Sequence, residues 1–88
     1  MKVKINRIEY DLDEKDYCIF NGACYILMTR QYFKDWGYHH PIFPKTLMNK
    51  MLKEGSAYLS SRKYRVRLQG TEHVYPVYRF REKEGDEK

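Results

Sequence analysis

Polar and apolar residues alternate with a period of two near the beginning of the chain. Lys2-Val3-Lys4-Ile5 and Ile8-Glu9-Tyr10-Asp11-Leu12 alternate on either side of Asn6-Arg7. Alternation of this kind places every second side chain on the same face of a strand. The pattern predicts a small N-terminal β-hairpin that turns at Asn6-Arg7.

A second alternating segment near the end of the chain is longer and strongly basic. The period of two begins at Tyr58, and in residues 63–68 (KYRVRL) every second residue is cationic. This pattern predicts a half-buried strand. We expect a loop over Gln69 to His73 and a partner strand over Val74 to Arg81. Pro76 lacks a backbone donor, which predicts that this partner strand lies at a sheet edge.

Between these segments the chain has one clear helical period. The apolar residues of Lys45 to Glu54 form a single stripe, with Pro44 at a position that a helix start tolerates and Gly55 at a position that ends a helix. The sequence therefore predicts a helix from Lys45 to Glu54. Its opposite arc is polar and basic, and consists of Thr46, Asn49, Lys50 and Lys53.

Asn21-Gly22 allows two interpretations. As a hairpin turn it would join two strands, Tyr17 to Phe20 and Ala23 to Met28, which are rich in β-branched and aromatic residues. As a helix stop it would end a short helix and precede a second helix from Ala23 to Trp36. The sequence leaves both models open.

Acidic residues and a further turn surround this segment. The acids from Asp13 to Asp16 suit the first turn of a helix, with Asp11 or Asp13 as its cap. Gly37-Tyr38-His39-His40-Pro41 is typical of a turn, so a preceding helix would end near Trp36.

The length of 88 residues and a composition of 42% hydrophobic and 33% charged residues predict one small domain. We place it at residues 1–81, followed by a flexible charged tail at 82–88. The longest apolar run, Ala23 to Met28, is too short to cross a bilayer, and the charged start lacks a signal peptide. We expect a cytoplasmic protein without membrane contact. Cys18 and Cys24 are expected to be reduced and buried.

Positive charge is concentrated in the second half of the chain. The net charge is +5; residues 40–81 have nine Lys/Arg against two Asp/Glu, whereas residues 1–39 have six of each. Segregated cations indicate a nucleic acid partner, because they neutralise phosphates and release counterions. The candidate contact residues are Lys45, Thr46, Asn49, Lys50, Lys53, Arg62, Lys63, Arg65, Arg67, Arg79 and Arg81.

The order of a helical segment, a turn with Gly37, a basic helix after Pro44 and a two-stranded basic ribbon resembles a winged helix-turn-helix DNA-binding domain. The resemblance covers Ala23 to Arg81. It implies that the polar face of the helix, Thr46, Asn49, Lys50 and Lys53, enters the major groove. It also implies that Arg65, Arg67, Arg79 and Arg81 form the wing.

These observations give one expectation for fold and function. The fold is a small α+β domain, winged-helix-like, with an N-terminal β-hairpin and a C-terminal two-stranded basic wing. The function is that of a non-catalytic nucleic-acid-binding protein, with duplex DNA favoured, in a regulatory or accessory role.

Two further functions stay open. Single-stranded DNA or RNA would stack its bases on tyrosines of the sheet, namely Tyr58, Tyr64, Tyr75 and Tyr78. A protein-interaction module or inhibitor would dock through arginines and the aromatic anchors Tyr32, Trp36, Tyr38 and Phe43. One continuous face of helix lysines and ribbon arginines would favour nucleic acid, whereas scattered cations beside an exposed aromatic patch would favour a protein partner.

A structural role is the alternative for the ribbon. Tyr64, Tyr78 and Phe80 would then be core residues, and the arginines would keep an edge ribbon soluble. No catalytic or cofactor signature is present, and we expect no metal or cofactor. Cys18, Cys24, His39 and His40 lack the ligand spacing of a zinc site.

Overall fold

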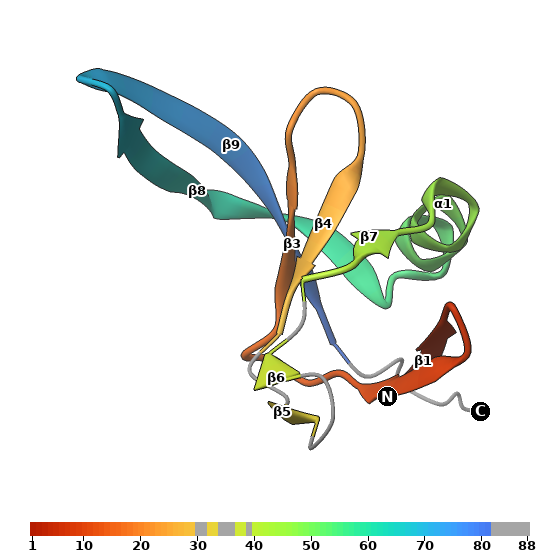
Figure 1. The fold of residues 1–88 in the computed structure, drawn as a ribbon. Helices are drawn as coiled ribbons and strands as arrows, with labels where there is room; N and C mark the ends of the chain where they lie inside the picture. Colours follow the sequence, from red (N-terminus) through yellow and green to blue (C-terminus); the bar gives the residue numbers. More distant parts are fainter. Residues whose placement is uncertain (30–31, 34–36, 39, 82–88) are drawn as a thin grey trace.

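A five-stranded antiparallel sheet in the order β7-β4-β3-β9-β8 forms the centre of the computed structural model (Figure 1). The structure describes residues 1–29, 32–33, 37–38 and 40–81. The strands of the sheet are β3 (Tyr17–Phe20), β4 (Tyr25–Met28), β7 (Ile42–Phe43), β8 (Ala57–Leu68) and β9 (Thr71–Phe80). Two small sheets pair β1 (Lys2–Ile5) with β2 (Ile8–Asp11) and β5 (Tyr32–Phe33) with β6 (Gly37–Tyr38), and α1 (Lys45–Glu54) follows β7.

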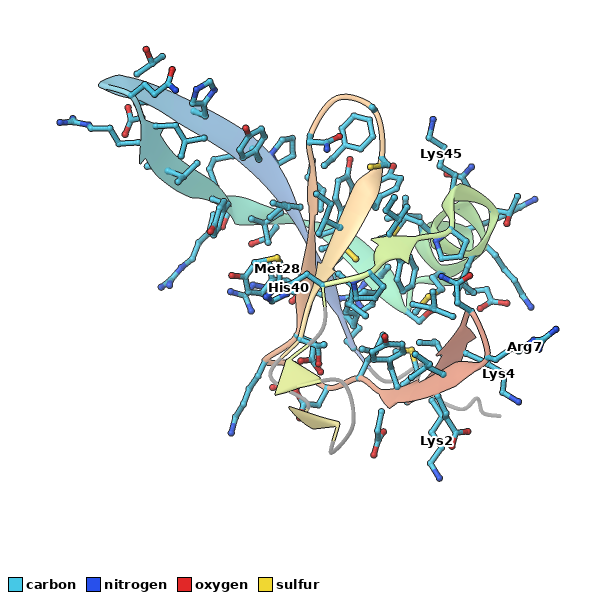
Figure 2. All side chains as sticks on the ribbon, in the orientation of Figure 1. Lys2, Lys4, Arg7, Met28, His40 and Lys45 are labelled. Carbon is cyan, nitrogen blue, oxygen red and sulfur yellow. The ribbon has the colours of Figure 1, made fainter. Side chains whose placement is uncertain are left out.

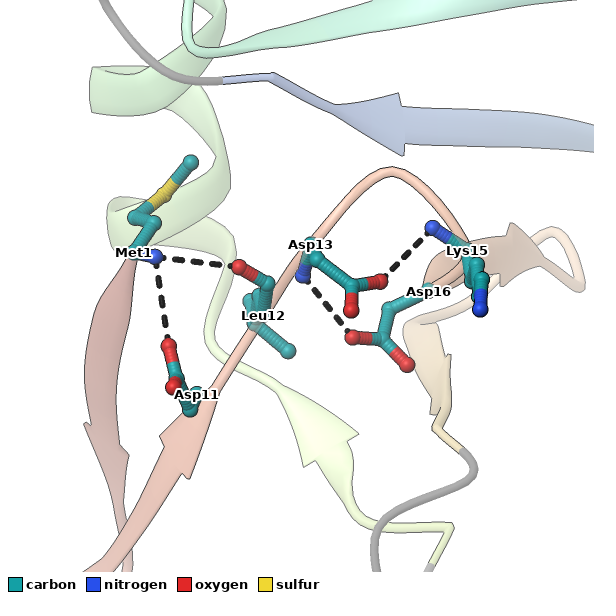
Figure 3. A network of polar contacts seen from close by, with 6 residues as sticks. All are labelled: Met1, Asp11, Leu12, Asp13, Lys15 and Asp16. Atoms are coloured by element: carbon teal, nitrogen blue, oxygen red, sulfur yellow. Dashed lines mark hydrogen bonds and ion pairs between the residues drawn. The ribbon is translucent and has the colours of Figure 1, made fainter.

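The predicted N-terminal hairpin is confirmed. β1 and β2 pair antiparallel, and Asn6 and Arg7 adopt positive φ angles of 51° and 69°. Two residues with positive φ give the turn whose twist matches that of the strands. The Met1 ammonium group donates hydrogen bonds to Asp11 Oδ1 (3.3 Å) and to the Leu12 carbonyl (3.0 Å), which closes the open end of the hairpin (Figure 3).

The hairpin model at Asn21-Gly22 is confirmed and the helical alternative is wrong. β3 and β4 pair antiparallel from Tyr17↔Met28 to Phe20↔Tyr25. The Asn21 side-chain oxygen accepts hydrogen bonds from the backbone N–H of Ala23 and of Cys24, both at 2.9 Å. The Asn21 backbone N–H also donates to the Cys24 carbonyl (3.2 Å), so the chain reverses at Gly22-Ala23 and not at Asn21-Gly22, and the Asn21 side chain organises the connection.

The acids before β3 form a turn instead of a helix start. Asp16 Oδ2 accepts from the backbone N–H of Asp13 (2.9 Å), and Asp13 Oδ1 accepts from that of Lys15 (2.8 Å) (Figure 3). The carboxylates satisfy backbone donors, as predicted for caps, but the chain continues as the strand β3. The helix expected over this segment is wrong, because Tyr17 to Ile19 pair with β9.

The helix α1 has the predicted bounds. Pro44 is its N-cap residue, and Gly55 ends it with φ 88°, donating its N–H to the Met51 carbonyl (2.9 Å). Glycine reaches this left-handed conformation without steric cost. Met48 and Met51 are buried, so the predicted apolar stripe faces the core.

The core lies between one face of the five-stranded sheet, α1 and the N-terminal hairpin. We call this sheet face the core face. Directly opposite residues of an antiparallel pair share a face, and the pairs Cys18↔Leu27, Tyr25↔Phe43 and Ala57↔Phe80 all lie on it. The buried cluster comprises Ile5, Tyr10, Leu12, Cys18, Leu27, Phe43, Met48, Met51, Ala57 and Phe80.

The ribbon of β8 and β9 projects past the rest of the sheet (Figure 1). It turns at Gln69 and Gly70, which have φ 51° and 78°, so the predicted loop to His73 is wrong beyond these two residues. Between the pairs Leu59↔Tyr78 and Lys63↔Pro76, β8 has three residues against one of β9. Such a bulge bends and twists a strand.

The predicted edge position of β9 is wrong. β9 lies between β3 and β8, and its pairing with β3 extends from Arg79 to Val77, the residue that directly follows Pro76. β8 is the edge strand instead. The proline therefore stands where β9 leaves the five-stranded sheet and continues only in the ribbon.

The expected fold class is confirmed in its coarse form: a small α+β domain with antiparallel sheets. Within the described ranges α1 is the one helix, and the first helix implied by the helix-turn-helix resemblance is replaced by strands. Gly37 and Tyr38, predicted to be turn residues, pair with Tyr32 and Phe33. Trp36, His39 and the predicted tail at 82–88 lie outside the described residues. No described helix is both long and apolar enough to span a bilayer.

Candidate nucleic-acid interface

The candidate contact residues fall into separate groups in the structure. Those of the helix lie on α1, at the side of the molecule away from the tip of the ribbon (Figure 1). Arg62, Lys63, Arg65 and Arg67 lie on β8 at or beyond the bulge. Arg79 lies near the end of β9 and Arg81 directly follows that strand, at the end of the sheet away from the tip of the ribbon. The continuous basic face that would join helix and ribbon is not formed.

The ribbon cations share one face. Lys63, Arg65 and Arg67 pair with Pro76, Val74 and Glu72 respectively, so all these side chains lie on the same side. The lysine and both arginines are exposed. One ion pair, Arg65 Nη1 to Glu72 Oε2 at 3.8 Å, joins side chains that are 63% and 51% exposed. An exposed pair of this length contributes little stability, so Arg65 is available to another anion.

The helix cations face a different direction. Lys45 points outward from the start of α1, and Lys2, Lys4 and Arg7 point outward from the N-terminal hairpin, on the side away from the ribbon (Figure 2). Lys50 lines a groove of about 270 Å³ between α1 and β1. α1 and the tip of the ribbon lie at opposite sides of the domain, so a ligand would contact both groups only by spanning the domain (Figure 1).

Arg79 and Arg81 are engaged in contacts that hold the domain together. Arg79 donates to the Glu14 carbonyl (3.2 Å), and its guanidinium lies 5.6 Å from the Tyr17 ring centroid. Arg81 donates through Nε to the Gly55 carbonyl (2.8 Å) and lies 4.8 Å from the Tyr58 ring centroid. A cation at the carbonyl that ends α1 also complements the helix dipole. Both residues therefore have structural roles, in addition to the charge they present.

Aromatic side chains form a continuous series on the opposite sheet face, which we call the outer face. Tyr17 and Tyr58 both pair directly with Arg79. The ring centroids of Tyr17 and Tyr64 are 6.5 Å apart, and those of Tyr64 and Tyr75 are also 6.5 Å apart. The centroids of Tyr75 and His73 are 6.3 Å apart. We call Tyr58, Tyr17, Tyr64, Tyr75 and His73 the aromatic row; all five are half-buried.

The sequence predicted part of this row. Tyr58, Tyr64 and Tyr75 belong to it, but Tyr78 lies on the core face, where it packs edge-on against Tyr25 at 5.2 Å. Tyr17 and His73 were not predicted. Their membership depends on the pairing of β3 with β9 and on the short turn of the ribbon, and neither is visible in local alternation.

The aromatic anchors expected for a protein partner receive no support as a set. Phe43 is fully buried, with its ring 5.6 Å from that of Phe80, so it is a core residue. Tyr32 and Tyr38 lie in the short sheet of β5 and β6, and Trp36 is outside the described residues. The structural alternative for the ribbon holds for Phe80, which is fully buried, and for Tyr78, which packs against the core cluster. Tyr64 is half-buried on the outer face and is not part of that cluster.

The thiols lie in different surroundings. Cys18 is fully buried, whereas Cys24 is half-buried, so the expectation of burial is correct for Cys18 alone. Burial raises the pKa of the Cys18 thiol far above its usual range, because the thiolate would lose its hydration. A thiol kept neutral in this way is a poor nucleophile. Among the described residues, His, Cys, Asp and Glu form no group of three or more suited to a metal ion.

Thiol labelling tests this difference. In the native protein at pH 8 we expect Cys24 to react rapidly with a disulfide reagent and Cys18 to react only after unfolding, because reaction needs an accessible thiolate. The Cys24→Ser variant should lose the rapid phase, and the Cys18→Ala variant should keep it. Rapid native labelling of the Cys24→Ser variant would contradict the assigned burial.

Comparison with known proteins adds no relative. No protein-family model, curated protein or solved structure matches this chain.

Proposed function

We propose that this protein is a non-catalytic nucleic-acid-binding protein and that the β8–β9 ribbon is its contact surface. The observation that supports this most directly is the register of the ribbon, which places Lys63, Arg65 and Arg67 together on one face beyond the core. Side chains that project from a ribbon without covering a core are free to contact phosphates. Glu72 is the one acidic residue on the described ribbon.

The shape of the ribbon fits this role. A two-stranded antiparallel ribbon is narrow enough to enter a major groove or to lie along a strand's backbone. Turn residues with positive φ keep its tip tight, and the bulge sets its angle to the sheet. The geometry thus favours contact through the ribbon over the insertion of α1 that the winged-helix resemblance implies. A regulatory or accessory role remains part of the proposal.

The test is the binding of labelled duplex and single-stranded oligonucleotides, measured by fluorescence anisotropy over a series of salt concentrations. The double variant Arg65→Ala/Arg67→Ala should weaken binding about tenfold and lower the slope of log K against log salt by roughly 1.5–2, because two phosphate contacts are lost. The matched control is Lys50→Ala/Lys53→Ala, which removes the same charge from α1 and should leave the slope unchanged. Equal losses in the two variants would assign binding to net charge instead of the ribbon, and absence of binding to either oligonucleotide at low salt would refute the proposal.

A protein partner is the second candidate, supported by apolar side chains at the exposed surface. Leu59, Leu68 and Val74 on the ribbon are 55%, 52% and 46% exposed, and Ile42 on β7 is 61% exposed. Apolar residues beside arginines are typical of protein interfaces. If the protein binds none of the oligonucleotides, a protein partner becomes the better-supported candidate.

A further inference from the structure

The outer face of the sheet has a surface chemistry different from that of the cationic ribbon face. Its strand positions follow from the register: Tyr58, Tyr64, Val66 and Leu68 on β8 lie with Thr71, His73, Tyr75, Val77 and Arg79 on β9 and with Tyr17 and Ile19 on β3. None of these positions is acidic. Glu72 lies on the other side of the ribbon, so the outer face combines aromatic rings with positive charge alone.

We infer that the aromatic row is a stacking surface for the unpaired bases of a single-stranded nucleic acid. This inference rests on the proposed function and names its ligand class. Bases of any sequence present a planar π surface, and aromatic side chains on a sheet bind them by stacking, worth about 1–3 kcal/mol per base. Duplex DNA keeps its bases paired and stacked inside the helix, so it cannot use these rings.

The geometry of the row suits successive bases. Tyr64 and Tyr75 are directly opposite on neighbouring strands, with ring planes 29° apart, and His73 and Tyr75 are nearly parallel at 8°. Their centroids are 6.3–6.5 Å apart, so the rings stand beside one another without close stacking. Each ring is half-buried and keeps part of its surface open to a ligand.

The charges beside the row are complementary to a phosphate backbone. Arg79 lies between Tyr17 and Tyr58, and Arg81 lies over Tyr58. Arg79 donates through Nη1 to the Glu14 carbonyl and Arg81 through Nε to the Gly55 carbonyl, so each guanidinium has further N–H donors for phosphate. A strand bound along the row would therefore meet phosphate-binding cations at the base of the sheet, whereas the ribbon cations lie on the opposite face.

The rings of the aromatic row could have a competing, structural role, which is to cover the apolar side chains on the outer face. Ile19 and Val77 on the outer face are 7% and 4% exposed, so neighbouring side chains do shield them. This role accounts for rings close to Val77. It does not account for His73, which lies four residues farther along β9 toward the tip of the ribbon, beyond the last pair with β3.

The experiment compares ring removal with ring retention. Fluorescence anisotropy is measured with labelled oligo-dT, oligo-U and a DNA hairpin duplex. The Tyr64→Leu/Tyr75→Leu variant should lose about tenfold to a hundredfold in affinity for the single strands and keep its affinity for the duplex. The Tyr64→Phe/Tyr75→Phe variant should bind all three within about twofold of the parent, because the rings are kept. Stronger binding to oligo-U than to oligo-dT would identify RNA as the source of the bases, and the reverse would identify DNA.

Each outcome has a separate meaning. Unchanged single-strand binding by the leucine variant, or an equal loss for single strands and duplex, would overturn the stacking surface while leaving the ribbon as the binding element. Failure of the parent to bind any of the oligonucleotides would overturn the proposed function itself. If the leucine variant does not fold, NMR of the parent decides: oligo-dT should shift the ring protons of Tyr64, Tyr75 and His73, and shifts confined to other residues would refute the inference.

Discussion

Phe43→Ala is expected to lower the free energy of unfolding by about 3–5 kcal/mol. The Phe43 side chain is fully buried, and its ring lies 5.6 Å from that of Phe80 on β9. β7 has two residues and pairs with β4 at the edge of the five-stranded sheet, so this ring fixes the edge of the sheet to the core. Small domains have a total stability of about 5–15 kcal/mol, so the loss would be a large part of it.

Chemical denaturation followed by circular dichroism measures this effect. The matched control is Ile42→Ala, the neighbouring residue on the same strand, whose side chain is 61% exposed. Adjacent residues of a strand point to opposite faces, so the control should change stability by less than about 0.5 kcal/mol. Similar losses in the two variants would show that the burial assigned to β7 is incorrect.

Tyr10→Ala should destabilise the whole domain by about 3–5 kcal/mol, not only the N-terminal hairpin. β1 and β2 form a sheet of their own, with no pairing to the five-stranded sheet. Their attachment comes from Ile5, Tyr10 and Leu12, which are 2%, 0% and 1% exposed and belong to the same buried cluster as Met48 of α1. Loss of the tyrosine ring would leave a cavity in that shared core.

Native-state hydrogen exchange distinguishes a shared core from an independent hairpin. In the Tyr10→Ala variant the amides of β3 and β9 should lose protection together with those of β2, because one cooperative unit opens. Glu9→Ala, at the neighbouring exposed position, should leave protection unchanged. Loss of protection confined to β1 and β2 would show that the hairpin folds as a separate unit.

Local signals in the sequence predicted the elements whose ends are fixed by nearby residues. Gly55 ends α1 because only a residue tolerant of positive φ fits there, and Asn6-Arg7 closes a hairpin between two alternating segments. The alternation in residues 63–68 correctly separated the ribbon cations from Tyr64 and Val66. Each of these signals acts over a few residues, so the sequence reveals it directly.

The candidate interface was predicted less well than the elements. The basic helix and the basic ribbon are adjacent in sequence, which favoured a single surface, yet α1 packs on the core face while the ribbon projects beyond it (Figure 1). Arg79 and Arg81 are cationic by composition, but their hydrogen bonds to Glu14 and Gly55 give them structural roles. Composition shows which charges exist, and packing decides which of them are available to a ligand.

The sequence by itself determined α1, the two alternating hairpins and the division of residues 63–68 into a cationic and an apolar face, since these depend on local periodicity and turn chemistry. The tertiary structure alone decided that Asn21-Gly22 lies in a hairpin, that β9 is a central strand and that Tyr17 joins the aromatic row. These features depend on pairs such as Tyr17↔Arg79, whose members are far apart in the chain. Sheet order and the choice of face are fixed by such distant pairings, because a strand acquires its neighbours only when the chain folds.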